Sequence, residues 1–146
     1  MYSKELLEKY ADVLIEKGVN IQKGQYLLLQ CCIDTLPLAR IICEKALLKG
    51  AKDVHVSISD PVIKKLRGKY LSQEQCSVVY DFEKEELDYF LRNDCVQIGL
   101  MGTYPRLMEG VSDENAMALA YAGNEVRNVV RKYIHDGTLQ WTGTAY

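Results

Sequence analysis

One segment of the chain limits its fold more than any other, a nearly continuous apolar run from Gln25 to Ile33. A strand with water on one face alternates apolar and polar residues, whereas a strand buried on both faces reads as an unbroken apolar run. The run therefore predicts a strand that other parts of the chain cover on both sides.

Strand and helix patterns alternate along the rest of the sequence. Apolar residues recur at every second position through 54–58 and 96–100, which predicts two more strands. Helix patterns separate these strands, and the segments concerned are 3–18, 37–50, 61–70, the surroundings of 87–91, and 112 to about 135. A short extra turn is expected at 72–75 and a last strand at 141–146. Such alternation predicts a small α/β three-layer sandwich, with a mostly parallel sheet and helices on both faces.

Local signals indicate where several helices begin and end. Ser3, Asp34-Thr35, Asp60-Pro61 and Ser112 offer oxygen atoms suited to N-caps. Gly18 and Gly50 are expected to end the first two helices. The apolar residues expected on the third and the long helix are Val62, Ile63, Leu66, Tyr70, Met117, Ala120, Tyr121, Val126, Val130 and Tyr133.

Composition excludes several classes of partner. The length of 146 residues fits one domain, and a net charge of −2 gives no basic surface for nucleic acid. Met1-Tyr-Ser3 leads directly into an amphipathic segment, without a signal core or a membrane-length apolar run. Five cysteines, an odd number without zinc-site spacing, indicate reduced thiols in a cytoplasmic protein.

Four residues are candidates for a substrate cleft: Asp34, Thr35, Asp60 and Tyr104. They follow the three expected strands, and ligands approach parallel sheets at the carboxyl ends of the strands. The plainer interpretation is that both aspartates are helix N-caps, a role that each position suits without any ligand.

No catalytic or metal-binding residue can be assigned from the sequence. A hydrolytic metal site needs several convergent ligands, and no spacing links the two histidines, His55 and His135. The adjacent Cys31 and Cys32 are interpreted as small buried hydrophobic residues, and glycine patterns for nucleotide binding are lacking.

The first sixty residues carry an ordered series of motifs. The strongest are Gly18-Val-Asn-Ile-Gln-Lys-Gly-Gln25, Ala39-Arg-Ile-Ile-Cys-Glu-Lys-Ala46 and Gly50-Ala-Lys-Asp-Val-His-Val56. A second block, Gly102-Thr-Tyr-Pro105-Arg-Leu-Met-Glu-Gly110, follows in register. Together they resemble the N-terminal domain of the metalloaminopeptidases typified by aminopeptidases T and S, the thermophilic metalloprotease family.

The resemblance implies the non-catalytic part of an enzyme that removes N-terminal residues from peptides. In that family a divalent metal pair, of zinc, cobalt or manganese type, is held by the C-terminal half. We expect no cofactor in this chain, an N-terminal α/β domain over 1–137, and the start of a connection to the catalytic domain over 138–146. The expected partner is that catalytic domain or another copy of this chain.

Two other interpretations stay open: a freestanding small-molecule or protein-binding module, and a dimerisation domain. The binding module would be favoured by convergence of Asp34, Asp60 and Tyr104 on a closed pocket. Any docking face is expected at the carboxyl ends of the strands, with Trp141 on it.

Overall fold

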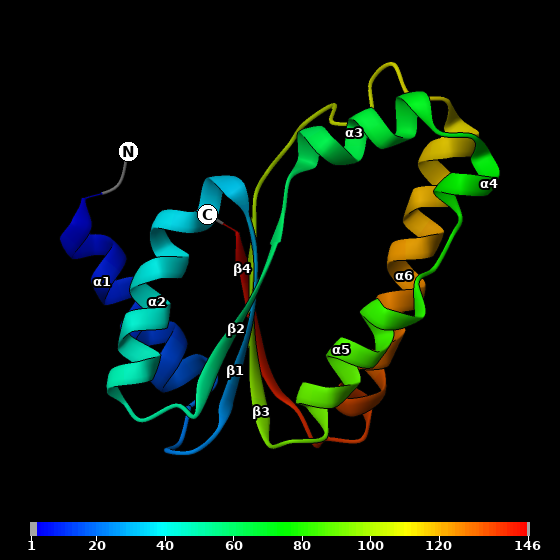
Figure 1. Ribbon diagram of the computed structural model, residues 1–146. Coiled ribbons are helices and arrows are strands. Elements are labelled where there is room, and N and C mark those ends of the chain that lie inside the picture. The colour runs from blue at the N-terminus through cyan, green and yellow to red at the C-terminus, as the bar shows by residue number, and fades with distance from the viewer. Residues whose placement is uncertain (1–2, 146) are drawn as a thin grey trace.

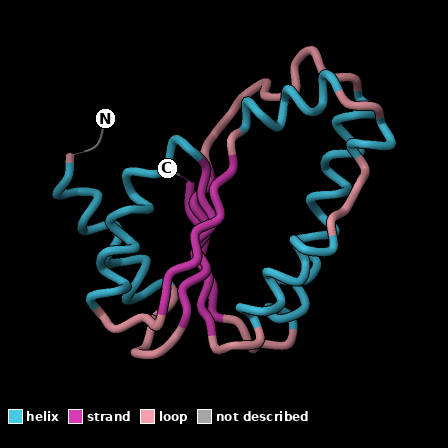
Figure 2. The backbone as a smooth tube through the Cα atoms, in the orientation of Figure 1, coloured by secondary structure: helices cyan, strands magenta, loops and turns pink. Residues whose placement is uncertain are grey.

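Four parallel strands form the central sheet, in the order β2-β1-β3-β4. The computed structural model describes residues 3–145. The strands are β1 (Tyr26–Cys32), β2 (Asp53–Ser59), β3 (Cys95–Met101) and β4 (Gln140–Ala145). Helices cover both faces of the sheet, so the molecule has three layers (Figures 1 and 2). The predicted three-layer α/β architecture is confirmed, and every strand pair is parallel.

Strand β1 lies at the centre, as its apolar run predicts. It pairs with β2 on one side and β3 on the other, and Leu27, Leu28 and Leu29 are 0% exposed. The strand ends at Cys32, because Ile33 begins the short 3-10 helix η2 (Ile33–Thr35). Ile33, which the sequence assigned to the strand, is exposed.

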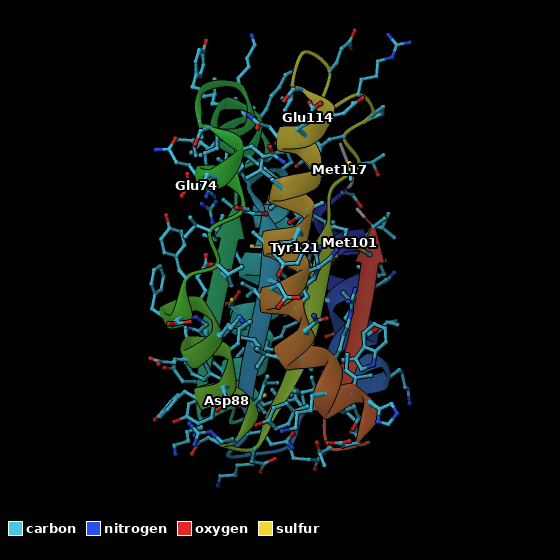
Figure 3. All side chains as sticks on the ribbon, turned by 90° about the vertical axis from the view of Figure 1, so that its right-hand side faces the viewer. Glu74, Asp88, Met101, Glu114, Met117 and Tyr121 are labelled. Carbon is cyan, nitrogen blue, oxygen red and sulfur yellow. The ribbon has the colours of Figure 1, made fainter. Side chains whose placement is uncertain are left out.

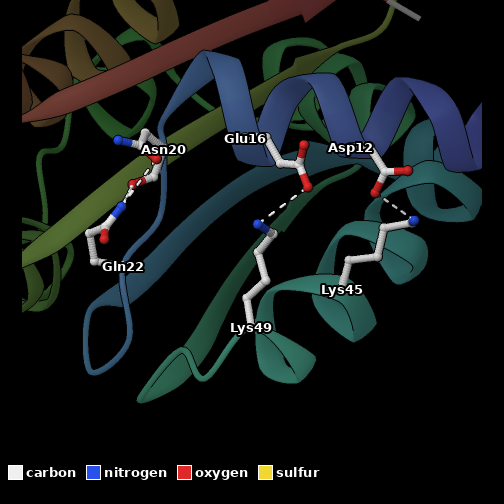
Figure 4. Close-up of polar contacts among 6 residues, drawn as sticks. All are labelled: Asp12, Glu16, Asn20, Gln22, Lys45 and Lys49. Atoms are coloured by element: carbon white, nitrogen blue, oxygen red, sulfur yellow. Dashed lines mark hydrogen bonds and ion pairs between the residues drawn. The ribbon is translucent and has the colours of Figure 1, made fainter.

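One face of the sheet is covered by α1 (Lys4–Val13), the π-helix η1 (Leu14–Gly18) and α2 (Leu36–Leu48). Their buried side chains form one cluster with Leu27, Leu29 and Ile98 from the strands. Figure 4 shows two ion pairs that join α1 and η1 to α2 and its C-cap Lys49: Asp12–Lys45 at 2.6 Å and Glu16–Lys49 at 3.3 Å. Because these side chains remain partly exposed, we assign most of the stability of this layer to apolar burial.

The opposite face carries α5 (Asp81–Leu91) and the long helix α6 (Asp113–His135). Leu28, Leu87 and Val130 belong to the apolar cluster beneath them. Only the C-terminal half of α6 belongs to this cluster. Its N-terminal half packs through Ala118 and Leu119 on the layer of α3 (Pro61–Tyr70) and α4 (Gln73–Cys76).

The predicted apolar faces of α3 and α6 are partly wrong. Met117 and Tyr121 are 72% and 57% exposed, on the outer side of α6 (Figure 3). The helix instead buries the smaller Ala118, because this half of α6 faces α3 and α4 rather than the sheet. The four apolar residues expected on α3, Val62, Ile63, Leu66 and Tyr70, are all exposed, and the residues buried there are Pro61 and Gly68.

Most of the predicted helix signals are confirmed. Ser3, Asp60 and Ser112 each accept a hydrogen bond from the first turn of their helix, and Gly50 ends α2 with φ +91°. Within residues 3–145, no helix is both long enough and apolar enough to cross a membrane.

Gly18 ends the first helix as predicted, because it is the last residue of η1, but it is not a C′ glycine, since its φ is not positive. A Cβ atom at this position would come within 2.8 Å of the Thr142 Cγ2 atom on β4. Gly18 therefore allows η1 to approach the edge strand closely.

Replacing Gly18 by alanine should lower the free energy of unfolding by about 1–3 kcal/mol, the usual cost of overpacking. Gly123→Ala on α6 is the matched control, because its Cβ would meet nothing closer than 3.7 Å. That control should stabilise the helix by about 0.5–1 kcal/mol. Urea unfolding followed by circular dichroism measures both, and a Gly18→Ala variant as stable as the wild type would contradict this account.

Candidate functional site

A cavity of about 550 Å³ lies between the sheet and α6, towards the carboxyl ends of the strands. Its floor includes Gln30, Gln97 and Trp141 from three strands, and its wall includes Arg127 and Arg131 from α6. A volume of this size is within the range of about 300–1,000 Å³ that is usual for small-ligand sites. The α6 residues in its lining are Arg127, Val130, Arg131 and Ile134, which belong to the C-terminal half of the helix that packs on the sheet.

The floor of the cavity is polar where the central strands leave the apolar core. Gln97 Nε2 donates a hydrogen bond of 3.1 Å to Gln30 Oε1. Gln97 Oε1 is buried and has no hydrogen-bond partner within residues 3–145. Strand alternation explains the placement, because Gln30 follows Leu28 on the α6 side of β1 while Leu29 faces the other layer.

Asp34 and Tyr104 meet above the strand ends, although the sequence placed them 70 positions apart. Tyr104 Oη donates a hydrogen bond of 2.6 Å to Asp34 Oδ2. Asp34 is therefore not the N-cap of α2 that the plainer interpretation assumed. The hydrogen bond to Asp34 is the main cause that raises the pKa of Tyr104 well above its ordinary value.

Thr35 is fully buried and serves the turn that follows β1. Its hydroxyl accepts a hydrogen bond of 3.1 Å from the Cys32 backbone N–H and donates one of 2.9 Å to the Cys32 carbonyl. With both bonds made inside the protein, this side chain holds η2 in place. It supports the neighbouring Asp34 rather than facing the cavity.

Cys32 lies in the cavity lining, next to these groups, and the sequence argument had treated it as a buried hydrophobic residue. It is 5% exposed, in agreement with that interpretation, and all five cysteines are free. Burial raises the pKa of the Cys32 thiol, but hydrogen bonds with Tyr104, Thr35 and the backbone outweigh burial and lower it.

Asp60 is the N-cap of α3, as the plainer interpretation held. Its Oδ1 atom accepts hydrogen bonds of 2.8 Å and 3.4 Å from the backbone N–H groups of Val62 and Ile63. Asp60 also lines the cavity, as does Tyr104. Among the four candidates the structure thus brings Asp60 and Tyr104 to one cavity, with Asp34 bound to Tyr104 and Thr35 beneath.

Trp141 lies where the docking face was expected. It is on the edge strand β4, 52% exposed, and it lines the cavity. The last strand expected at 141–146 is confirmed as β4, and it lies within the stretch 138–146 that was also expected to begin a connection. Tyr146 lies outside the described residues.

The side chains present do not fit a pair of metal ions. His55 Nε2 lies 3.1 Å from Glu86 Oε1 and its ring stacks on Phe90, while His135 is exposed beside Asp136. Within residues 3–145, no three histidine, cysteine or carboxylate side chains converge in a way that would hold a metal.

The sequence argument missed all three cations of the cavity lining, Lys64, Arg127 and Arg131. The spacing of the two arginines, four positions apart, places both on the same side of α6. That spacing was visible in the sequence. The cavity that they face depends on where α6 lies.

These features define an α/β domain whose candidate ligand residues gather at the carboxyl ends of a parallel sheet. The family model described as thermophilic metalloprotease (M29) matches residues 3–146. The chain therefore belongs to this family, and the resemblance seen in its motifs is confirmed.

Individual relatives agree with this assignment. Aminopeptidase AmpS of Bacillus subtilis is 29% identical over 136 residues, which cover 93% of this chain and 33% of that protein. Aminopeptidase PepS of Streptococcus thermophilus is 28% identical over 142 residues, 97% of this chain and 34% of PepS. The chain thus spans about a third of the length of these curated relatives.

A solved structure, wild-type AmpT from Thermus thermophilus, has the same fold. It matches with a TM-score of 0.89 at 23% sequence identity, covering 98% of this chain and 36% of that one.

The Tyr104–Asp34 hydrogen bond predicts a pH-dependent stability. Because the pKa of Tyr104 is raised in the folded protein, the stabilisation is present below the unfolded-state pKa of about 10 and is lost as the pH rises through the folded-state value. The free energy of unfolding of the wild type should therefore fall more steeply above pH ~10 than that of Tyr104→Phe.

Tyr70→Phe is the matched control, because the Tyr70 side chain is 76% exposed. It should follow the wild-type curve. Urea unfolding at a series of alkaline pH values measures all three proteins. Parallel curves for the wild type and Tyr104→Phe would contradict the assigned hydrogen bond.

Proposed function

We propose that this chain serves as the non-catalytic N-terminal domain of a metal-dependent aminopeptidase, which hydrolyses N-terminal residues from peptides. The observation that carries the proposal is membership of the metalloprotease family combined with coverage of only about a third of the relatives' length. The catalytic groups, and a metal pair of zinc, cobalt or manganese type, would then belong to the remaining two thirds.

In this proposal the carboxyl edge of the sheet forms one wall of the substrate cleft. Asp60 and Tyr104 line the cavity there, Asp34 fixes the Tyr104 hydroxyl, and Thr35 holds the turn. The peptide would pass along this wall. Five free thiols suit a cytoplasmic protein, which is the compartment that we propose.

The partner that we propose is the catalytic domain of the same protein, reached by way of residues 138–146. Exposed apolar side chains occur near the carboxyl ends of the strands and at the start of α3, and they are Ile33, Ile58, Met101, Val62 and Ile63. Exposed apolar side chains at this edge would suit a contact with another protein surface. A second copy of the chain is the alternative occupant, which would make this a dimerisation domain.

A freestanding small-molecule or protein-binding module is the second candidate function. The cavity, with Asp60 and Tyr104 in its lining, favours it. The two functions predict different results when a catalytic domain is supplied. An N-terminal enzyme domain should help that domain to hydrolyse peptides, whereas a freestanding binding module should not affect its activity.

The 146-residue chain alone should show no aminopeptidase activity and should bind no stoichiometric divalent metal. The reason is that its two histidines make no shared site: the His55 ring on β2 stacks on Phe90, and His135 is exposed beside Asp136. Elemental analysis and an aminoacyl-anilide assay with added zinc, cobalt or manganese measure this. Turnover that persists through repurification would overturn the expectation.

A chimera tests the domain role directly. We expect this chain, fused in place of the N-terminal third of Bacillus subtilis AmpS, to restore aminoacyl-anilide hydrolysis to an AmpS that lacks that third. The control is the truncated AmpS by itself. A folded, metal-loaded chimera no more active than the truncated protein would contradict the proposed function.

A further inference from the structure

The charge of the cavity lining is opposite to that of the chain. The chain has a net charge of −2, yet the lining contains the cations Lys64, Arg127 and Arg131 against one carboxylate, Asp60. Asp60 already accepts two backbone hydrogen bonds from α3. The cavity is therefore a positively charged site on a weakly acidic protein.

The two arginines retain unused hydrogen-bond donors. Within the described residues neither lies within 4.0 Å of a carboxylate, and each donates to one asparagine amide oxygen, Asn124 at 2.8 Å and Asn128 at 2.9 Å. A guanidinium has five N–H donors. Like charges four positions apart on a helix repel each other, so an anion between Arg127 and Arg131 would relieve a cost that the helix otherwise bears.

The remainder of the lining suits an apolar body attached to that anion. Trp141 lines the cavity from β4, Leu107 from the loop after β3, and Ile134 from the next turn of α6. The Gln30–Gln97 amide pair lies on the floor, where a polar backbone group finds partners. A ligand that fits these groups needs a carboxylate at one end, backbone amides and apolar side chains. A short peptide has all three.

We propose that this cavity binds a short apolar peptide by its free C-terminal carboxylate, with the carboxylate on Arg127 and Arg131 and a side chain against Trp141. The identity of the ligand as a peptide rests on the proposed function. The anionic end follows from the lining itself, because bidentate donors on Arg suit a carboxylate.

The test uses N-acetyl-leucyl-leucine and its C-terminal amide as probes. The acetyl group removes the free amine, so an aminopeptidase cannot hydrolyse either probe and binding is separated from turnover. Trp141 is the single tryptophan of the chain, so its fluorescence reports on the cavity. The acid should produce a saturable change, and the neutral amide should bind about tenfold more weakly.

Variants on α6 locate the carboxylate. Arg127→Gln and Arg131→Gln should each weaken binding of the acid about fivefold, the factor expected for one partly exposed ion pair, and leave the amide unchanged. Lys132→Gln is the matched control, since Lys132 is an exposed cation on the same helix that does not line the cavity. It should bind the acid as the wild type does. Circular dichroism verifies that each variant is folded.

Three outcomes would overturn the inference: equal affinity for acid and amide, equal loss in Lys132→Gln, or inorganic phosphate competing as tightly as the peptide acid. The last would indicate a general anion site. Failure of the chimera would remove the aminopeptidase role while leaving the binding result intact, so the two proposals fail separately.

Discussion

Burial of β1 on both faces is the constraint on which the rest of the structure depends. Leu27, Leu28 and Leu29 are completely buried between two neighbouring strands and two helical layers. A strand in that position needs its backbone groups paired on both edges and its side chains covered on both sides. The order β2-β1-β3-β4 and the division of helices between the faces both satisfy that need.

The site follows from where this burial stops. Beyond Leu28, the residues of β1 on its α6 side are Gln30 and Cys32, which line the cavity. Towards its N-terminus, α6 packs on α3 and α4 rather than on the sheet. The cavity lies at this polar end of the strands, and its α6 lining comes from the half of the helix that packs on the sheet. The same division of α6 explains why Ala118 is buried where a longer apolar side chain was expected.

The candidate site was predicted only in part. Position after a strand correctly indicated that Asp60 and Tyr104 lie at the carboxyl edge, because chain direction fixes that edge in a parallel sheet. The partner of Asp34 was missed, since a carboxylate at the start of a helix has a local use as a cap, and its hydrogen bond with Tyr104 is a long-range contact. The cavity arginines were missed for a related reason: nothing in a solvated helix face indicates what lies opposite it.

The sequence by itself determined the kind and order of the elements and the central strand, because hydrophobic periodicity and capping residues act over a few positions. The family followed from the ordered motifs that the chain shares with it. Only the tertiary structure decided three contacts. The missing side chain of Gly18 leaves room for Thr142 on β4, Asp34 accepts a hydrogen bond from the Tyr104 hydroxyl, and Arg127 lines the cavity. Each of these contacts joins elements that are distant along the chain. Their geometry is set by how helices and strands pack, and no local pattern contains it.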